Sequence, residues 1–353
     1  MFEDITYSLG LEIDPRTASV YFGLALGLVF GVLAQLTRFC LRRALIGERA
    51  ERSSAAGVWA AALAVALLGT QAAVSIGWIS FDEHRFHVSE VPILAIAIGG
   101  VLFGIGTVLA RGCISRLTVL SGTGNLRALI ALPVIAIFAH MTLKGVLAPL
   151  RVELGSNTVD LGSWTTLGSW PGGPWLWTAL IVALAGWLVV RSGASLGALM
   201  GGAALGALVP LGWVGTGFLL YDEFDPIALE SLSLTSPWTE TLFWSVASSS
   251  IAPSFGVGLI GGILAGGLLV ALGSGQFRWQ SFESPAQTGR TLSGAVLMGV
   301  GGVLAGGCSI GAGLAGIPTL SVAAVLALAS IIAGILVAHA VQTRLTGAVA
   351  APA

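Results

Sequence analysis

The sequence is poor in charged residues, and this scarcity sets the class of protein. Only 9% of its 353 residues are Asp, Glu, Lys or Arg, whereas a soluble domain carries about 25%. A chain with 55% hydrophobic residues cannot cover a water-facing surface with so few charges, and it is too hydrophobic to be disordered. The net charge of −1 also excludes the basic footprint of a nucleic-acid-binding protein. The sequence therefore predicts a protein surrounded by lipid.

Several chemical motifs are absent as well. No nucleotide-binding G-x-x-x-x-G-K-[ST] loop occurs, so a source of energy other than bound nucleotide is expected. There is no C-x-x-C and there are only four histidines, so we expect no metal site and no cofactor. The chain has three cysteines. Because an odd number cannot pair completely, a structural disulfide is disfavoured. Residues 1–14 are acidic and lack the basic start of a signal peptide.

Long uncharged windows indicate the membrane-spanning segments. Seven stretches hold no Asp, Glu, Lys or Arg, namely 17–37, 53–81, 91–110, 161–190, 192–221, 241–277 and 291–343. A helix needs about 20 mostly apolar residues to cross a bilayer, and several windows hold one or two passes. Their apolar runs do not alternate with polar residues as the strands of a membrane barrel do. We predict an all-α polytopic membrane protein, one membrane domain over 1–353 with roughly eight to ten embedded helices.

The placement of arginine predicts the orientation. Of 16 basic residues 15 are Arg. A dense basic cluster consists of Arg38, Arg42, Arg43, Arg49 and Arg52, and Arg278, Arg290 and Arg344 follow in later connections. Acidic residues lie elsewhere, at Glu3, Asp4, Glu12 and Asp14 and within 222–230. The positive-inside rule then places the C-terminus in the cytoplasm and the N-terminus outside, with an odd number of complete passes.

All three cysteines close the same repeated element. A shift of 195 places 99–113 on 294–308 with ten of fifteen residues identical. A shift of 73 places Gly27, Phe30, Gly31, Arg38 and Cys40 on Gly100, Phe103, Gly104, Arg111 and Cys113. A weaker fourth copy has Gly215 at the cysteine position. We therefore predict two pseudo-symmetric repeats, about 15–150 and 175–345, which combine long transmembrane helices with short broken or re-entrant ones.

The repeated cysteines are the candidate site. A single buried Cys is often only a small apolar side chain, but Cys40, Cys113 and Cys308 occupy equivalent positions. A thiol in apolar surroundings stays protonated, and beside a helix N-terminus it suits a soft, sulfur-bearing anion. We expect Gly112 and Gly307 to provide backbone conformations closed to other residues. Two further residues, Arg38 and Arg111, each lie two positions before a cysteine and are candidates for attracting the anion.

These segments resemble the YeeE/YedE family of sulfur-transport membrane proteins over roughly 20–345. The likeness rests on Gly27-x-x-Phe30-Gly31, Arg38-Phe39-Cys40, Leu109-Ala110-Arg111-Gly112-Cys113 and Leu304-Ala305-Gly306-Gly307-Cys308. It implies a bacterial inner-membrane protein with an hourglass fold that takes up thiosulfate and is not an enzyme. It also implies that Cys40, Cys113 and Cys308 relay the ion through a narrow waist, and that a small cytoplasmic TusA-like sulfurtransferase is a partner.

Three mechanisms stay open at this stage. The leading one is passage of intact thiosulfate along the thiols to the cytoplasm. The second is an intramembrane protein whose cysteine becomes persulfidated and hands sulfane sulfur to a carrier. The third is an anion channel in which the thiols only pack. Some members of the family handle selenium or other sulfur species, so another cargo is also compatible with the resemblance.

Overall fold

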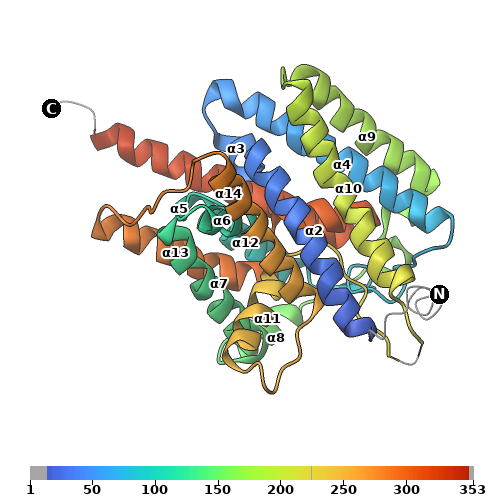
Figure 1. The fold of residues 1–353 in the computed structure, drawn as a ribbon. Helices are drawn as coiled ribbons and strands as arrows, with labels where there is room; N and C mark the ends of the chain where they lie inside the picture. The colour runs from blue at the N-terminus through green and yellow to red at the C-terminus, as the bar shows by residue number, and fades with distance from the viewer. Residues whose placement is uncertain (1–13, 224, 350–353) are drawn as a thin grey trace.

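The computed structural model describes residues 14–223 and 225–349, most of which lie in helices (Figure 1). The acidic residues Glu3, Asp4 and Glu12, which entered the predicted orientation, lie outside the described residues. The helices before the mid-chain connection are α2 (Pro15–Thr37), α3 (Leu41–Ile46), α4 (Arg49–Ser75), α5 (Ile93–Leu109), α6 (Ile114–Gly122), α7 (Leu126–Lys144) and α8 (Ala148–Gly155). A short antiparallel pair joins β1 (Glu90–Val91) to β2 (Val159–Asp160).

The second half of the chain is built in the same way. Its elements are η1 (Gly162–Thr165), η2 (Leu167–Ser169), α9 (Gly173–Arg191), α10 (Leu196–Val214), η3 (Gly215–Leu219), α11 (Thr235–Val246), α12 (Phe255–Gly273), α13 (Pro285–Leu304), η4 (Ser309–Gly316), η5 (Ile317–Thr319) and α14 (Val322–Val349). Here η3 and η4 are π-helical turns, and the other η elements are 3₁₀ turns.

Nine helical segments in the described part of the chain are long and apolar enough to cross a membrane. This confirms the predicted all-α polytopic class, and the number falls within the expected range. Three of the nine, Pro15–Ile46, Ile93–Gly122 and Pro285–Thr319, each contain a break in the helix. These three broken segments carry the three cysteines.

Polar residues start several of the helices. Asp14 accepts a hydrogen bond from the backbone N–H of Thr17 at 3.0 Å, directly before Pro15 opens α2. In the same way, Asn125 caps α7 and Ser284 caps α13. Such caps satisfy backbone N–H groups that have no partner inside the helix. Polar side chains therefore mark the start of these apolar helices.

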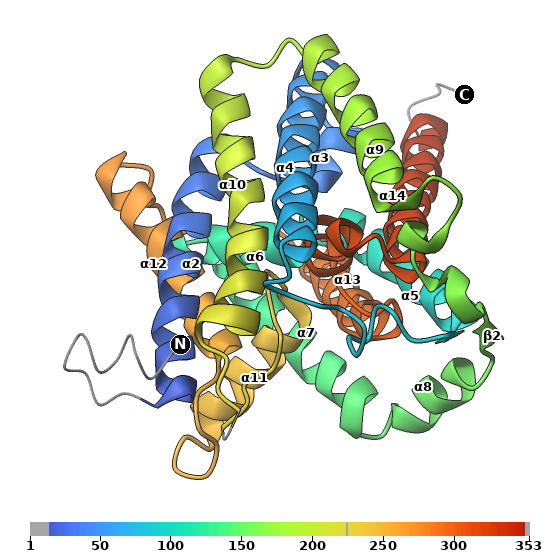
Figure 2. The ribbon, with the colours of Figure 1, turned by 90° about the vertical axis from the view of Figure 1, so that its right-hand side faces the viewer.

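Glycines bring helices from the two halves of the chain into backbone contact. A Cβ on Gly27 of α2 would lie 2.2 Å from the carbonyl oxygen of Leu259 in α12, and one on Gly206 of α10 would lie 2.1 Å from that of Ala62 in α4. Figure 2 shows α2 running alongside α12. Small residues allow such close approach in a bilayer, where packing takes over from the hydrophobic effect.

The helix pairs exchange partners between the halves. The helix α2 packs on α12 while α10 packs on α4, and α5 packs on α14 while α13 packs on α7. In the middle of the bundle, α5 and α13 pack on each other. The division into repeats of about 15–150 and 175–345 predicts pairs of this kind and stays a prediction.

The basic residues gather at one end of the bundle. Arg116 donates to Gln35 near the end of α2, Ser53 of α4 donates to the carbonyl of Arg191, and Asn125 donates to Gln280. These contacts join the connections at that end, where twelve basic residues lie: Arg38, Arg42, Arg43, Arg49, Arg52, Arg111, Arg116, Arg127, Arg191, Arg278, Arg290 and Arg344. The opposite end of the described chain holds Arg16, Arg85, Lys144 and Arg151, together with most of the acidic residues.

The glycine contacts make a direct prediction about stability. Gly27→Ala forces a methyl group against the backbone of α12, and overpacking of this kind costs about 1 to 3 kcal/mol. Thermal unfolding of the detergent-solubilised protein will show a lower midpoint. Gly186→Ala is the matched control, because nothing lies within 4 Å of a Cβ at that position of α9. Equal midpoints for the two variants would contradict the close packing of α2 on α12.

Candidate functional site

Three helices end in the same way just before a cysteine. The residue two positions before each cysteine has a left-handed backbone, namely Arg38 (φ 51°), Arg111 (φ 58°) and Gly306 (φ 72°). The cysteine itself is extended and forms the N-cap of the next short helix, so Cys40 precedes α3, Cys113 precedes α6 and Cys308 precedes η4. Each thiol therefore lies beside the N-terminus of a short helix.

Backbone hydrogen bonds close each break. At the end of α2, Arg38 N–H donates to Gln35 O and Phe39 N–H to Ala34 O. At the end of α5, Arg111 N–H donates to Val108 O and Gly112 N–H to Thr107 O. This pattern satisfies the last carbonyls of a helix through one left-handed residue.

The glycines differ in part from the expectation. Gly112 is not among the left-handed residues, because the helix cap requires that conformation one position earlier, at Arg111. In the last break the left-handed residue is Gly306, within the expected Gly306-Gly307 pair. Gly307 instead allows a close approach between two parts of the backbone, since a Cβ added at this position would lie 2.9 Å from the backbone nitrogen of Ala312.

The weaker fourth copy has no such break. Helix α10 continues into η3, and Gly215 keeps an ordinary helical backbone with φ −61°. The described chain therefore has three breaks of this kind, and all three carry a cysteine.

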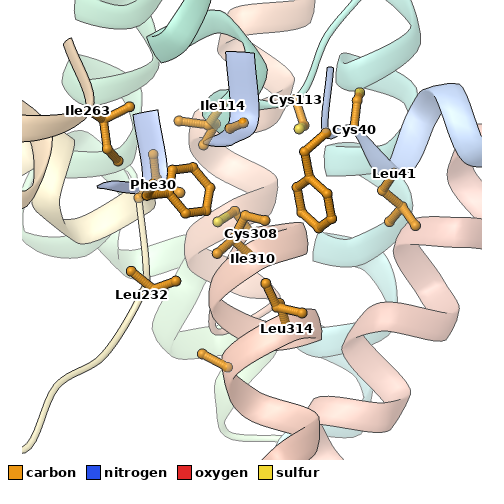
Figure 3. Close-up of a cluster of buried hydrophobic side chains, with 14 of the residues drawn as sticks. Phe30, Cys40, Leu41, Cys113, Ile114, Leu232, Ile263, Cys308, Ile310 and Leu314 are labelled. Atoms are coloured by element: carbon orange, nitrogen blue, oxygen red, sulfur yellow. The ribbon is translucent and has the colours of Figure 1, made fainter. Parts of the chain in front are cut away.

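The three cysteines come together in the middle of the molecule (Figure 3). They are free thiols, and Cys40, Cys113 and Cys308 are 8%, 2% and 1% exposed. The side chains of Cys40 and Cys113 hydrogen-bond to each other.

Hydroxyl groups extend this contact to the third break. The sulfur of Cys113 lies 3.1 Å from Ser115 Oγ and also interacts with the hydroxyl of Ser309, the residue after Cys308. The backbone N–H of Gly311 donates to Cys308 Sγ at 3.4 Å. Thiols and hydroxyls therefore form a polar line that runs from Cys40 through Cys113 to Ser309, the residue beside Cys308.

Apolar side chains surround this line. Phe30, Ile114, Ile310 and Leu314 belong to the same buried cluster as the cysteines (Figure 3), and each is at most 1% exposed. In this low-dielectric setting an unpaired polar group is costly. The thiols and the hydroxyls of Ser115 and Ser309 are therefore polar groups enclosed by an apolar wall.

Two groups of arginines lie around the thiols. Arg38 and Arg111, the candidates from the sequence, are exposed. Arg111 lines a small cavity of about 90 Å³ together with Arg127 and Arg290. Arg42 and Arg116 are the arginines that lie within electrostatic range of both Cys40 and Cys113.

Arg42 and Arg116 lie in the first turn of the short helices α3 and α6. Arg116 donates to Gln35 Oε1 at 3.1 Å, whereas Nε of Arg42 is buried and has no hydrogen-bond partner in the described part of the chain. The signal that points to both is their position two or three residues after a cysteine, where the first turn of the new helix keeps a side chain near its N-cap. From the sequence alone, the basic cluster after Cys40, which contains Arg42, is either an anion vestibule or a topology signal, and Arg38 and Arg111 are the candidates for attracting the anion.

A cavity of about 820 Å³ opens from the acidic end of the bundle toward Cys308. Gly311 and Ala315 of η4 form part of its wall, and Gly311 is the residue whose N–H contacts Cys308. Polar and charged residues line its remainder, among them Asp82, Glu83, His84, Arg85, Ser233, Ser236, Glu230 and Glu240. Burial lowers the pKa of His84 to about 4, so this histidine is neutral at pH 7.

Comparison with known proteins relates this site to transport. The family model described as "Sulphur transport" matches residues 36–337. A protein of Spirochaeta thermophila named thiosulfate transporter TsuA is 26% identical over 325 residues, covering 87% of this chain and 94% of that protein. The thiosulfate transporter TsuA of Escherichia coli is 27% identical over 326 residues, covering 83% of this chain and 86% of that protein. The match agrees with the expected resemblance and with a transport protein rather than an enzyme.

The left-handed residues predict a second effect on stability. No atom lies within 4 Å of a Cβ at Gly306, so Gly306→Ala adds only the strain of a left-handed backbone, about 1 to 2 kcal/mol. Its thermal unfolding midpoint will fall. Arg111→Gly removes the same strain from α5 and will raise the midpoint.

Gly197→Ala in α10 serves as the control, since it has free space and an ordinary backbone. If Gly306→Ala is as stable as this control, then the left-handed cap does not limit stability at the break.

Proposed function

Because this chain belongs to the sulphur-transport family, we propose that it takes up thiosulfate across the bacterial inner membrane. The ion passes intact through the centre of the molecule and leaves unmodified to the cytoplasm. The observation that carries this proposal is the line of three thiols at three helix N-termini, joined by the hydroxyls of Ser115 and Ser309. The relatives that bear the name thiosulfate transporter support the choice of cargo.

The chemistry of the line suits thiosulfate. Its terminal sulfur is soft and polarisable, and a neutral S–H group is a weak donor with the same softness. Backbone N–H groups at a helix N-terminus favour an anion. A thiolate would instead repel a doubly charged ion, so the relay depends on protonated thiols in an apolar wall.

The path begins in the cavity that adjoins Gly311. From there the ion meets Cys308 first, then Cys113, and then Cys40 near the basic end. Arg42 and Arg116 are the cations whose charges reach the last two thiols, so they draw the anion inward. Gly112 and Gly307 bring backbone amides close to the path, while Arg38 and Arg111 attract the ion at the basic end of the bundle.

The separation of charges supports an orientation. Twelve of the basic residues lie at one end of the bundle, and the positive-inside rule makes that end cytoplasmic. The C-terminus is then cytoplasmic, the N-terminus is periplasmic, and the 820 Å³ cavity faces the periplasm.

Two inverted repeats, about 15–150 and 175–345, form an hourglass whose waist holds the thiols. Their helices α2 and α10 enter from opposite faces.

A cytoplasmic partner completes the proposal. Thiosulfate that leaves at Cys40 reaches a face rich in arginine, where a small TusA-like sulfurtransferase consumes it. Consumption keeps the inner concentration low and favours net uptake without a nucleotide.

Uptake of radiolabelled thiosulfate tests the function. In a bacterium that lacks its own sulfate and thiosulfate uptake, the native chain will support growth on thiosulfate. Cys113→Ala and Cys308→Ala, which remove a thiol from the centre of the line, will each lower the initial rate at least about tenfold, as expected when one contact of about 1.4 kcal/mol is lost in the limiting step.

Thr142→Val is the control for these variants. Its hydroxyl is buried but bonds only to the carbonyl of Phe138 in its own helix. If the cysteine variants transport as fast as Thr142→Val, then the relay is wrong and the thiols only pack.

A mass increase of one sulfur atom on a cysteine after exposure to thiosulfate would favour persulfide transfer instead. Equal uptake of chloride would favour a channel, and competition by selenium analogues would widen the range of cargo.

Cysteine labelling tests the orientation. An impermeant maleimide added to intact cells will label Asn157→Cys, which lies in the exposed connection after α8. Ser274→Cys, exposed at the end of α12, will be labelled only after the membrane is permeabilised. The native thiols are buried and give a low background. The reverse result would invert the proposed orientation.

A further inference from the structure

The 820 Å³ cavity has an unexpected charge for the entrance of a divalent anion. Asp82, Glu83, Glu230 and Glu240 line it, while Arg85 is its single Arg or Lys among the lining residues. If all four carboxyl groups are ionised, the cavity is negative and opposes a dianion. A proton on one of them reduces this repulsion for an anion that moves toward Cys308.

Glu230 is the carboxyl group placed to lose its charge. Its backbone is held at the cavity wall, because its N–H donates to Thr216 Oγ1 at 3.0 Å and the same hydroxyl donates to its carbonyl at 2.7 Å. The next residue, Ser231, is anchored to the carbonyl of Val209 at 2.8 Å. These bonds fix the point from which the Glu230 side chain enters the lining of the cavity.

The surroundings of Glu230 favour its neutral form. Burial, together with the negative charge of Glu240, raises the pKa of Glu230 to about 7, and the positive charge of Arg85 opposes this shift. Glu240 is itself fixed by a hydrogen bond from Ser254 Oγ at 2.5 Å. The protonation of Glu230 thus changes within the ordinary range of external pH.

A second observation points to a ligand in the same place. Trp213 lines the cavity and is only 3% exposed, yet its indole N–H has no hydrogen-bond partner in the described part of the chain. Its ring is held edge-on by Phe81 and His84 at centroid distances of 5.1 and 5.3 Å. A buried N–H without a partner is costly unless something accepts from it.

We infer that this cavity is an outer binding site for a divalent oxyanion, and that the anion binds there together with one proton on Glu230. Arg85 supplies the positive charge, Trp213 Nε1–H donates to an oxygen of the anion, and the carboxylic O–H of neutral Glu230 donates to another. Loss of the proton turns Glu230 into a repelling carboxylate that pairs electrostatically with Arg85. The inference rests on the proposed function for the identity of the anion as thiosulfate.

The other titratable groups near the cavity do not explain a pH dependence of anion binding near neutrality. His84 has a pKa of about 4 and stays neutral above pH 6, and burial also lowers the pKa of His87, which lines the neighbouring cavity. Asp82 and Glu83 are exposed on the loop before β1. Glu240 and Arg85 shift the midpoint of Glu230 in opposite directions. Glu230 is therefore the group that links anion binding to pH near neutrality.

Linkage gives the expected pH dependence of uptake. With a pKa of about 7, Glu230 is about 90% protonated at pH 6 and about 10% at pH 8. Uptake of radiolabelled thiosulfate into proteoliposomes at concentrations well below saturation will therefore fall about tenfold as the external pH rises from 6 to 8. Glu230→Gln, which is permanently neutral, will transport at pH 8 as fast as at pH 6.

Two variants define the control and the direction of the shift. Glu223→Gln removes an exposed carboxylate outside the cavity and will keep the pH profile of the native chain. Glu240→Gln removes the charge that disfavours ionised Glu230, so it will move the midpoint of the profile to lower pH. Because glutamine still accepts the hydrogen bond from Ser254, this second variant does not depend on the folding of Glu230→Gln.

Proton uptake gives a measurement that needs no variant. When sodium thiosulfate is added to native protein in weakly buffered detergent at pH 7, each protein molecule will take up as much as roughly half a proton. The pH of the solution will rise accordingly. At pH 5.5 it will cause no change.

The outcomes separate this inference from the proposed function. If the native chain transports no thiosulfate at any pH, the proposed function fails. If it transports thiosulfate equally well at pH 6 and pH 8, or binds it at pH 7 without taking up protons, the function stands and the proton-linked site is wrong. A pH profile unchanged in Glu230→Gln and Glu240→Gln would overturn it as well.

Discussion

The structure depends on how it breaks helices inside a membrane. A backbone that leaves the helix in hydrocarbon must find new hydrogen bonds or be buried in protein. Here one left-handed residue follows the last turn of α2, α5 and α13, and a short helix with a cysteine at its N-cap begins after each of them. The glycine-lined contacts with α12 and α14 enclose these breaks. The central site is the place where three such helix ends are shielded from lipid.

This arrangement explains why cysteine suits the N-cap position. The usual capping residues, Ser, Asp and Asn, carry strong acceptors that would hold the helix N–H groups tightly. A thiol accepts only weakly, as in the 3.4 Å contact between Gly311 N–H and Cys308 Sγ. In the proposed relay, the N–H groups therefore remain able to turn to an anion, while the apolar wall keeps water away. A weak cap makes the stability of the break compatible with the proposed passage of the ion.

The site could be predicted in part from the sequence, and the limits have physical causes. Cysteines at equivalent repeat positions indicated the breaks, because a helix that restarts after Gly or Arg and Cys leaves a pattern along the chain. Arg42 and Arg116 could not be assigned to the thiols from the sequence, since their approach to the thiols depends on the direction of the short helices. Glu230 and Trp213 were missed, because only folding brings an irregular segment and the end of α10 to one cavity.

Composition and spacing alone determined that the chain is an all-α membrane protein, and they gave a range of eight to ten embedded helices that includes the nine membrane-capable segments of the described chain. These properties follow from local physics, because lipid demands apolar helices of a set length. The tertiary structure decided which helices meet, that the backbone turns left-handed at Arg111 and not at Gly112, and which charges face the thiols. Those properties depend on contacts between residues far apart in the chain, and no local pattern specifies them.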